Sequence, residues 1–369
     1  MRNRTRNRLL QGTFVLLSSS ALAACGAVIP DDFLSFEDCC GSLPPPPPSN
    51  NPPANTAASV ADVAPVGPGS NTDRVIWSQA LDDEELSGAL TFRLVQGARN
   101  TDYGQPALAQ NVPNITDAGA TLTLDVPADP DADVEVRFTI KDPGMGVQDV
   151  VLEEVVGTPQ LMATLPDGRI VRVTLDQTDR NSASVDGELN WAAYGAWNVS
   201  TASGTVQTAS YYVTGSETPD GNLPTSGTAT FDGFVVGNVT LPDGQNVKGA
   251  SLLGDASMTV DFGSGAINGA APNIIATPVG TIVPGSPVTP GSTQAWNGLT
   301  FTGTMTSGIN GFSGTTGVSS ATGNEYSLAG TADGFFSGLF YGPNANELGA
   351  VWNIADGVGA ATGVLIGKQ

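Results

Sequence analysis

Residues 330–354, with the sequence GTADGFFSGLFYGPNANELGAVWNI, constrain the fold more than any other stretch of the chain. Aromatic and aliphatic residues lead into Gly342, Pro343 and Asn344, which are residue types that set turn dihedrals. An apolar segment that includes Trp352 follows the turn, and segments of this type form the strands that β-sheets bury. The stretch therefore predicts a β-hairpin.

The composition favours an all-β fold. The chain has 369 residues, enough for two or three domains, and it contains 46 glycines and 26 prolines with few helix-favouring charged residues. Short alternating runs recur along it, such as ATLTLDV from Ala120 and VEVRFTI from Val134, and they indicate strands. The runs QLMATL and RIVRVTL flank Pro166, Asp167 and Gly168, which predicts a second hairpin.

Residues 1–24 have the features of a secretory signal peptide. Four arginines precede an apolar run that ends in small residues, and this run is too short and too polar to span a membrane as a helix. Residues 22–25, LAAC, match the bacterial lipobox, which predicts that Cys25 carries lipid and becomes the first residue after cleavage. The alternative is an ordinary secreted protein with a stray cysteine. Gly26, where inner-membrane lipoproteins have Asp, favours a lipid-anchored outer-membrane protein at the cell surface, with a periplasm-facing position also open.

Residues 25–73 are expected to form a disordered tether. They contain five consecutive prolines and no apolar periodicity, so their reach lies between about 40 Å as a coil and about 150 Å when extended. Cys39 and Cys40 are adjacent, and neighbouring Cα atoms lie about 3.8 Å apart, below the range of roughly 4.4–6.8 Å for a disulfide. Pairing between molecules and two unpaired thiols both remain open.

The charge balance is strongly acidic. Removal of the signal peptide takes four of the 14 basic residues and none of the 36 acidic ones, so the mature chain has a net charge of −26. Such a chain repels phosphate backbones and anionic head groups, so nucleic acid is not expected as a partner, and the membrane is contacted through the lipid anchor only. A cationic ligand and a merely solvated surface both fit this charge.

Large aromatic residues gather between residues 191 and 212. Trp191, Tyr194, Trp197, Tyr211 and Tyr212 lie close together in sequence, and rings of this size either anchor a core or face a partner. The core is the simpler interpretation, but Tyr211 and Tyr212 are also candidate ligand-binding residues.

The predicted hairpin resembles the closing hairpin of the barrel domain in the transferrin-binding protein B family of bacterial surface lipoproteins. The family pattern runs approximately G-x-F-Y-G-P-x-A-x-E-L-G-G-x-F, and this chain has Ala350 and Trp352 where the pattern has Gly and Phe. The resemblance implies a structural signature carried by the residues Phe340, Tyr341, Gly342, Pro343, Asn344, Glu347 and Gly349.

A second motif supports the same resemblance. The family carries G-x-x-T followed by P-x-x-G-x-A-x-Y-x-G, and this chain has matching residues at Gly215, Thr218, Pro224, Gly227, Ala229, Phe231 and Gly233, with Phe in place of Tyr. The resemblance implies an all-β protein with a β-rich handle-like domain at residues 74–220, followed by a closed eight-stranded antiparallel barrel at residues 221–369.

About eight short strands are expected in the barrel, one of them near residues 325–330, and a barrel of this size is filled by its own side chains. Glycines recurring within the strands fit sharp curvature and close approach between neighbouring strands. Residues 271–295 are nearly free of charge and are expected to form a long connection. Because long loops are often binding loops or disordered, Ile282 and Val283 are candidate ligand contacts.

Catalytic chemistry is not expected. The chain has no histidine, no G-x-S-x-G elbow and no nucleotide-binding glycine loop, so we predict neither an enzyme nor a bound cofactor. Asp129, Asp131 and Asp133 alternate like the first ligands of a calcium loop but lack the later Gly and acidic residue. They are weak metal candidates, and a solvated acidic face is the simpler interpretation.

The resemblance implies non-covalent capture of a protein or of a haem- or iron-related ligand, because family members bind host iron carriers, haem proteins or complement regulators, usually through loops and the handle. Two departures make transferrin itself doubtful. This chain has one handle-plus-barrel unit where transferrin receptors have two, and it is strongly acidic. The alternative is a surface-coat or cell-contact lipoprotein in which the barrel is a spacer.

Overall fold

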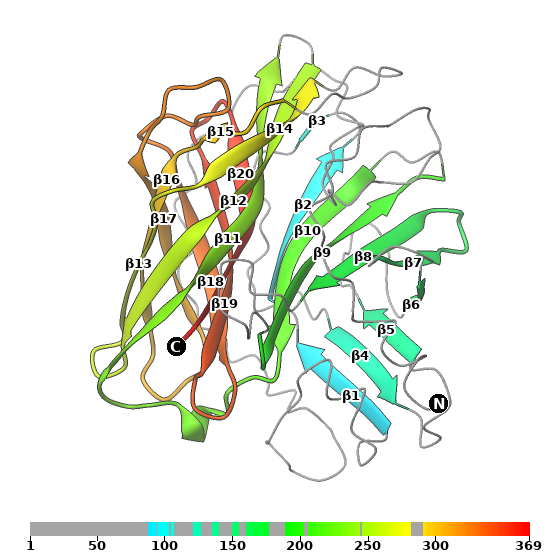
Figure 1. Cartoon of the computed structure of the whole chain (residues 1–369). Helices are drawn as coiled ribbons and strands as arrows, with labels where there is room; N and C mark the ends of the chain where they lie inside the picture. The colour runs from blue at the N-terminus through cyan, green and yellow to red at the C-terminus, as the bar shows by residue number, and fades with distance from the viewer. Residues whose placement is uncertain are drawn as a thin grey trace, which may run out of the picture.

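The computed structural model describes residues 88–93, 95–102, 105–106, 121–126, 135–139, 150–154, 160–176, 189–202, 206–243, 246–281 and 291–369. These residues form two sheets that lie side by side (Figure 1). Several residues singled out in the sequence lie outside this part of the chain, namely Cys25, Cys39, Cys40, Asp129, Asp131, Asp133, Ile282 and Val283. The predictions made for them remain predictions.

The first sheet, called here the N-terminal sheet, is antiparallel with the order β1-β4-β5-β6-β7-β8-β9-β10-β2-β3. Its strands are β1 (Gly88–Arg93), β2 (Val95–Asp102), β3 (Gln105–Pro106), β4 (Thr121–Val126), β5 (Glu135–Thr139), β6 (Val150–Glu154), β7 (Gln160–Thr164), β8 (Ile170–Asp176), β9 (Ala192–Ser200) and β10 (Val206–Gly215). One residue separates β1 from β2, yet β1 is at one end of this order and β2 next to the other end, so the sheet curls strongly. The hairpin predicted around Gly168 is confirmed by the pairing of β7 with β8, and Gly168 has a φ of 86°.

The second sheet closes into a barrel. After the 3-10 turn η3 (Asp220–Asn222) come β11 (Thr228–Asp243), β12 (Asn246–Asp261), β13 (Ala266–Ala271), β14 (Ile275–Thr281), β15 (Gln294–Ala295), β16 (Gly298–Met305), β17 (Phe312–Ser320), β18 (Asp333–Tyr341), β19 (Glu347–Ala355) and β20 (Ala360–Lys368). The order β11-β20-β19-β18-β17-β16-β13-β12 returns to β11, because β11 also pairs with β12. The predicted closed eight-stranded antiparallel barrel is confirmed, as is its C-terminal hairpin, β18 with β19.

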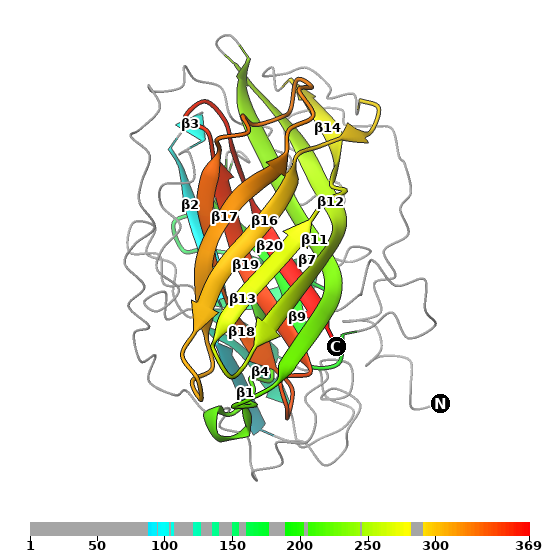
Figure 2. The same cartoon turned by 90° about the vertical axis from the view of Figure 1, so that its left-hand side faces the viewer.

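Two details of the predicted barrel were wrong. The strands are not all short, because β11 and β12 have 16 residues each. Residues 325–330 form no strand and belong to the connection between β17 and β18. Figure 2 shows the barrel wall formed by β13, β16 and β17, which is turned away from the N-terminal sheet.

The predicted connection at residues 271–295 is also wrong over part of its length. Residues 275–281 form β14, which pairs with the first half of β12, while β13 pairs with the second half. The prolines in this stretch made the sequence resemble a loop, so the strand was not predicted. Pro278 is tolerated because the pairing is irregular beside it, and a proline without an N–H fits such a bulge.

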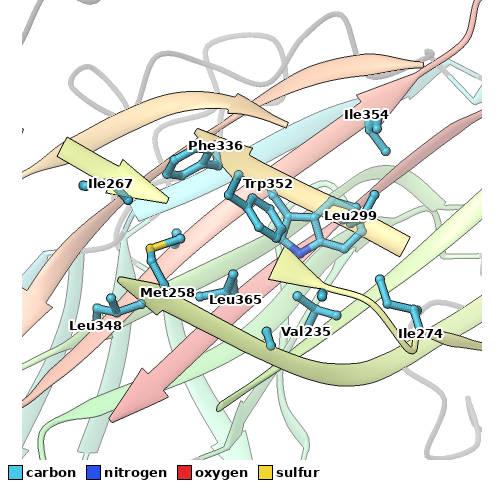
Figure 3. Close-up of a cluster of buried hydrophobic side chains, with 14 of the residues drawn as sticks. Val235, Met258, Ile267, Ile274, Leu299, Phe336, Leu348, Trp352, Ile354 and Leu365 are labelled. Atoms are coloured by element: carbon cyan, nitrogen blue, oxygen red, sulfur yellow. The ribbon is translucent and has the colours of Figure 1, made fainter. Parts of the chain in front are cut away.

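The barrel interior is filled with side chains (Figure 3). Trp352 is fully buried, and its indole Nε1 donates to the Val364 carbonyl at 3.0 Å. The ring covers the cross-strand glycine pair Gly237 and Gly363, where an added Cβ would come within 2.8 Å of the indole. Phe336 covers Gly303 and Gly314 in the same way, so these glycines make room for large rings. Their role agrees with the close approach expected from the sequence.

The N-terminal sheet packs against the outside of the barrel. Strands β9 and β10 contribute buried residues to a shared apolar cluster, and Tyr194 meets Phe234 of β11 edge-on with ring centroids 5.3 Å apart. The cluster joins Leu189, Ala192, Tyr194, Ala196, Tyr211 and Val213 of the N-terminal part to Phe234, Leu339, Tyr341, Val351, Val364 and Ile366 of the barrel. Figure 1 shows β9 and β10 beside the barrel strands β11 and β19.

Candidate functional site at the sheet–barrel junction

A buried glutamate joins the two sheets. Glu347 is the first residue of β19, and only 1% of its surface is exposed. Its carboxylate accepts three main-chain N–H groups that lead into β9: Asn190 donates to Oε1 at 2.6 Å, and Trp191 and Ala192 donate to Oε2 at 2.9 and 2.7 Å. Charge-assisted bonds of this kind are about twice as strong as neutral ones. The barrel therefore holds the beginning of β9 through one side chain.

The turn before Glu347 makes a second set of contacts. Gly342 has a φ of 86°, its N–H donates to the Ser216 carbonyl at 2.8 Å, and an added Cβ would lie 2.8 Å from Trp191 Cδ1. Thr218 donates from its hydroxyl to the Gly342 carbonyl at 2.6 Å and from its N–H to the Phe340 carbonyl at 2.9 Å. The two sequence motifs that carried the family resemblance therefore meet at this junction.

Burial is the largest influence on the pKa of Glu347 and raises it above its ordinary value of 4.5. The three N–H groups and the charge of Lys368 act in the opposite direction, because they favour the ionised form. The net direction is upward, so this carboxylate takes up a proton at a higher pH than an exposed glutamate does.

The remaining residues of the hairpin signature have separate structural roles. Phe340 lies inside the barrel against Phe312, with ring centroids 5.0 Å apart, while Tyr341 lies in the junction cluster. Asn344 is exposed, and Pro343 is partly buried. Gly349 has no positive φ, and close packing explains it, because an added Cβ would lie 3.1 Å from the Val213 side chain.

Tyr211 and Tyr212, the candidate ligand-binding residues of the sequence, are both buried in the structure. Only 6% of Tyr211 is exposed, and its hydroxyl accepts a hydrogen bond from Asn238 Nδ2 of the barrel. Tyr212 is fully buried, and its hydroxyl donates to the Thr174 carbonyl at 2.5 Å. Both rings belong to the core, which was the simpler interpretation.

One end of the barrel is covered by the connection between β17 and β18. The indole of Trp296 donates to the Tyr326 carbonyl at 2.8 Å, and the side-chain amide of Asn297 bonds both the N–H and the carbonyl of Leu328, at 3.0 and 2.9 Å. With the interior filled, groups able to meet a large partner lie on the outer surface.

Within the described ranges, no group of three or more His, Cys, Asp and Glu residues could hold a metal ion. No helix in the described part of the chain has the length and apolar character needed to cross a membrane.

Solved structures with some likeness to this chain include three binding proteins. They are intact Ap-TbpB (14% identity, 77% of this chain and 60% of that chain, TM-score 0.37), HpuA from Kingella denitrificans in complex with human haemoglobin (14%, 75% and 91%, 0.36), and transferrin-binding protein B from serogroup B Neisseria meningitidis (16%, 78% and 68%, 0.33). This chain therefore spans less than two thirds of Ap-TbpB. All three TM-scores are below 0.5, so we draw no functional conclusion from them. No curated protein matches the sequence.

A family comparison gives the firmer assignment. Residues 223–369 match the family described as "C-lobe and N-lobe beta barrels of Tf-binding protein B". The match begins just before β11 and continues to the last residue, so it covers all eight strands of the closed barrel. The resemblance predicted from the two motifs is confirmed, because residues 223–369 of this chain match the barrel domains of the transferrin-binding protein B family.

Proposed function

We propose that this protein is a lipid-anchored outer-membrane protein that captures a protein or a haem- or iron-related ligand by non-covalent contacts on its surface. The proposal is supported by the match of residues 223–369 to this family. The interior of the matched barrel is filled with side chains. A filled barrel has no room for a ligand, so recognition falls to outward-facing residues and to the N-terminal sheet.

The distribution of charge indicates that the barrel and the rest of the chain have different roles. Residues 221–369 contain eight acidic residues and two lysines, whereas residues 25–220 contain 28 acidic and eight basic residues. The barrel part therefore has a net charge of −6 and acts as a rigid support, whereas residues 25–220 have a net charge of −20 and supply most of the acidic field. Such a field speeds encounter with a cationic partner and is screened by salt.

Capture can be tested with defined ligands. The mature protein is immobilised, and transferrin, lactoferrin, haemoglobin and haemin are each passed over it while binding is recorded. We expect one of them to bind saturably, with an association rate that falls as salt rises and a dissociation rate that changes little. Absence of saturable binding for all four would overturn capture of this ligand class and favour the surface-coat alternative.

The anchor gives a separate prediction. Replacing Cys25 by Ser removes the thiol that the lipobox assigns to lipid, so we expect loss of lipid labelling and release from the membrane fraction. The matched controls are Cys39→Ser and Cys40→Ser, which should leave both properties unchanged. Fractionation of cells grown with a labelled fatty acid checks this, and membrane retention of the Cys25 variant would contradict the anchor.

A further inference from the structure

Arg172 lies on the face of the N-terminal sheet that looks toward the barrel. Its register partner on β9 is Asn198. On β9 the alternate residues Tyr194 and Ala196 pack into the cluster shared with the barrel, and successive residues of a strand point to opposite faces. Asn198 and Ser200 continue the face of Ala196, so Arg172, Asn198 and Ser200 share one side of the sheet.

Arg172 and Asn198 have incomplete polar contacts, whereas the Ser200 hydroxyl accepts from Arg172 and donates to the Ile170 carbonyl at 3.4 Å. The half-buried guanidinium of Arg172 donates to Ser200 Oγ at 2.8 Å, and no carboxylate in the described part of the chain lies within ion-pair distance of it. Asn198 is only 1% exposed, and its Oδ1 atom has no hydrogen-bond partner. Burial also lowers the pKa of Arg172, which is the direction expected for a cation without a counter-charge.

The facing side of the barrel becomes polar next to this cluster. Tyr211, the register partner of Ala196, bonds Asn238 of β11, and Thr240 follows on the same side of that strand. Both barrel residues are buried. The interface is thus apolar near Glu347 and polar further along β9, where buried amide and hydroxyl groups replace aliphatic side chains.

We infer that Arg172, Asn198 and Ser200 form a binding site for a carboxylate group. A guanidinium presents parallel N–H groups that match the two oxygens of a carboxylate. The Asn198 amide can turn to present its NH₂ group as a further donor, which moves Oδ1 out of its unpaired position. The site takes a carboxylate of a small acid or of an acidic side chain on a bound protein, because both present the same group.

The competing structure is an internal one, in which Arg172 donates to Asn198 Oδ1 and no ligand enters. The ligand site and this internal hydrogen bond respond differently to added carboxylate. A ligand site responds to added carboxylate at constant ionic strength, whereas an internal pair does not respond.

The test uses the mature chain labelled with ¹⁵N, with the Arg172 Nε–H and Asn198 amide signals followed by NMR. Sodium acetate is titrated against sodium chloride at fixed ionic strength and pH 7, and glutamate-containing peptides form a second arm that separates a small acid from a protein side chain. We expect saturable shifts with a Kd on the order of 1 mM for at least one carboxylate. Arg172→Gln should abolish saturation, and Arg172→Lys should weaken binding about fivefold or more, because an ammonium cannot make the paired contact.

Arg169 provides the matched control. It lies in the same β7–β8 hairpin but pairs with Asp167 at 2.7 Å, so Arg169→Gln should leave the titration unchanged. Unfolding temperatures show whether each variant folds. If Arg172→Gln does not fold, the Arg172→Lys variant still tests the site. Two results would overturn the site. One is that chloride and every carboxylate give equal NMR shifts. The other is that the Arg172→Lys variant binds carboxylate as well as the natural chain does.

Discussion

Replacing Glu347 by Ala is expected to lower the free energy of unfolding by about 3–5 kcal/mol, because three buried main-chain donors each lose an acceptor at a cost of about 1–3 kcal/mol. The variant leaves the N–H groups of Asn190, Trp191 and Ala192 without their acceptor in a buried place. Because these donors lie at the beginning of β9, the N-terminal sheet should also loosen from the barrel. Denaturant unfolding measures the first effect, and faster proteolysis near residue 190 reports the second.

The control is an exposed glutamate. Glu325 contacts Lys248 at 3.3 Å on the surface, so Glu325→Ala should change the free energy of unfolding by no more than about 1 kcal/mol. Similar losses for Glu325→Ala and Glu347→Ala would contradict the role given to the junction.

The pH dependence follows from the direction of the pKa shift. A carboxyl whose pKa is raised by folding binds more protons in the folded state than in the unfolded state, so its contribution to stability falls as pH rises. The fall begins near the ordinary value of 4.5 and ends above the raised pKa. Glu347→Gln cannot ionise, so the difference in unfolding free energy between the natural chain and this variant should decrease across that window. A difference that grows with pH would show that the hydrogen bonds outweigh burial.

The parts of the fold that the sequence predicted correctly have local signals. The turn at Gly342 and the turn at Gly168 both contain residues that tolerate φ near 86°, and each lies between two apolar runs. The closed barrel followed from strand patterns together with the family resemblance. Strand β14 was missed because Pro278 obscures its alternation, and only pairing with β12 shows that the stretch is extended.

The junction could not be predicted in the same way. Glu347 was included in the hairpin signature, but its partner Ala192 lies 155 residues earlier in the chain, and main-chain donors leave no mark in a sequence. The burial of Tyr211 could not be predicted either, because it depends on the barrel packing against β10. Tyr212 points to the opposite face of the strand, where its hydroxyl bonds the Thr174 carbonyl of β8. Arg172 carried no sequence signal, because only the structure shows that no carboxylate among the described residues pairs with it.

The second large effect is expected inside the barrel, at Gly363. Replacing Gly363 by Val should lower the free energy of unfolding by more than about 3 kcal/mol, because overpacking of a well-packed core with backbone displacement exceeds the usual 1–3 kcal/mol. An added Cβ at this position would lie 2.7 Å from Gly237 Cα and 2.8 Å from the Trp352 indole, and would collide with the Val236 carbonyl. Two of these three obstacles are backbone atoms of β11, so the pairing of β11 with β20 must shift.

Gly221 provides the control for Gly363, because an added Cβ there meets no atom within 4 Å and its backbone φ is not positive. Gly221→Val should therefore melt within a few degrees of the natural protein, while Gly363→Val should melt more than about 10 °C lower. Thermal unfolding followed by circular dichroism and Trp fluorescence measures both variants. The comparison also bears on function, because a barrel that accepts a valine at Gly363 without loss would have spare internal volume. Equal melting temperatures would therefore contradict the filled interior and, with it, the argument that places ligand capture on the outer surface.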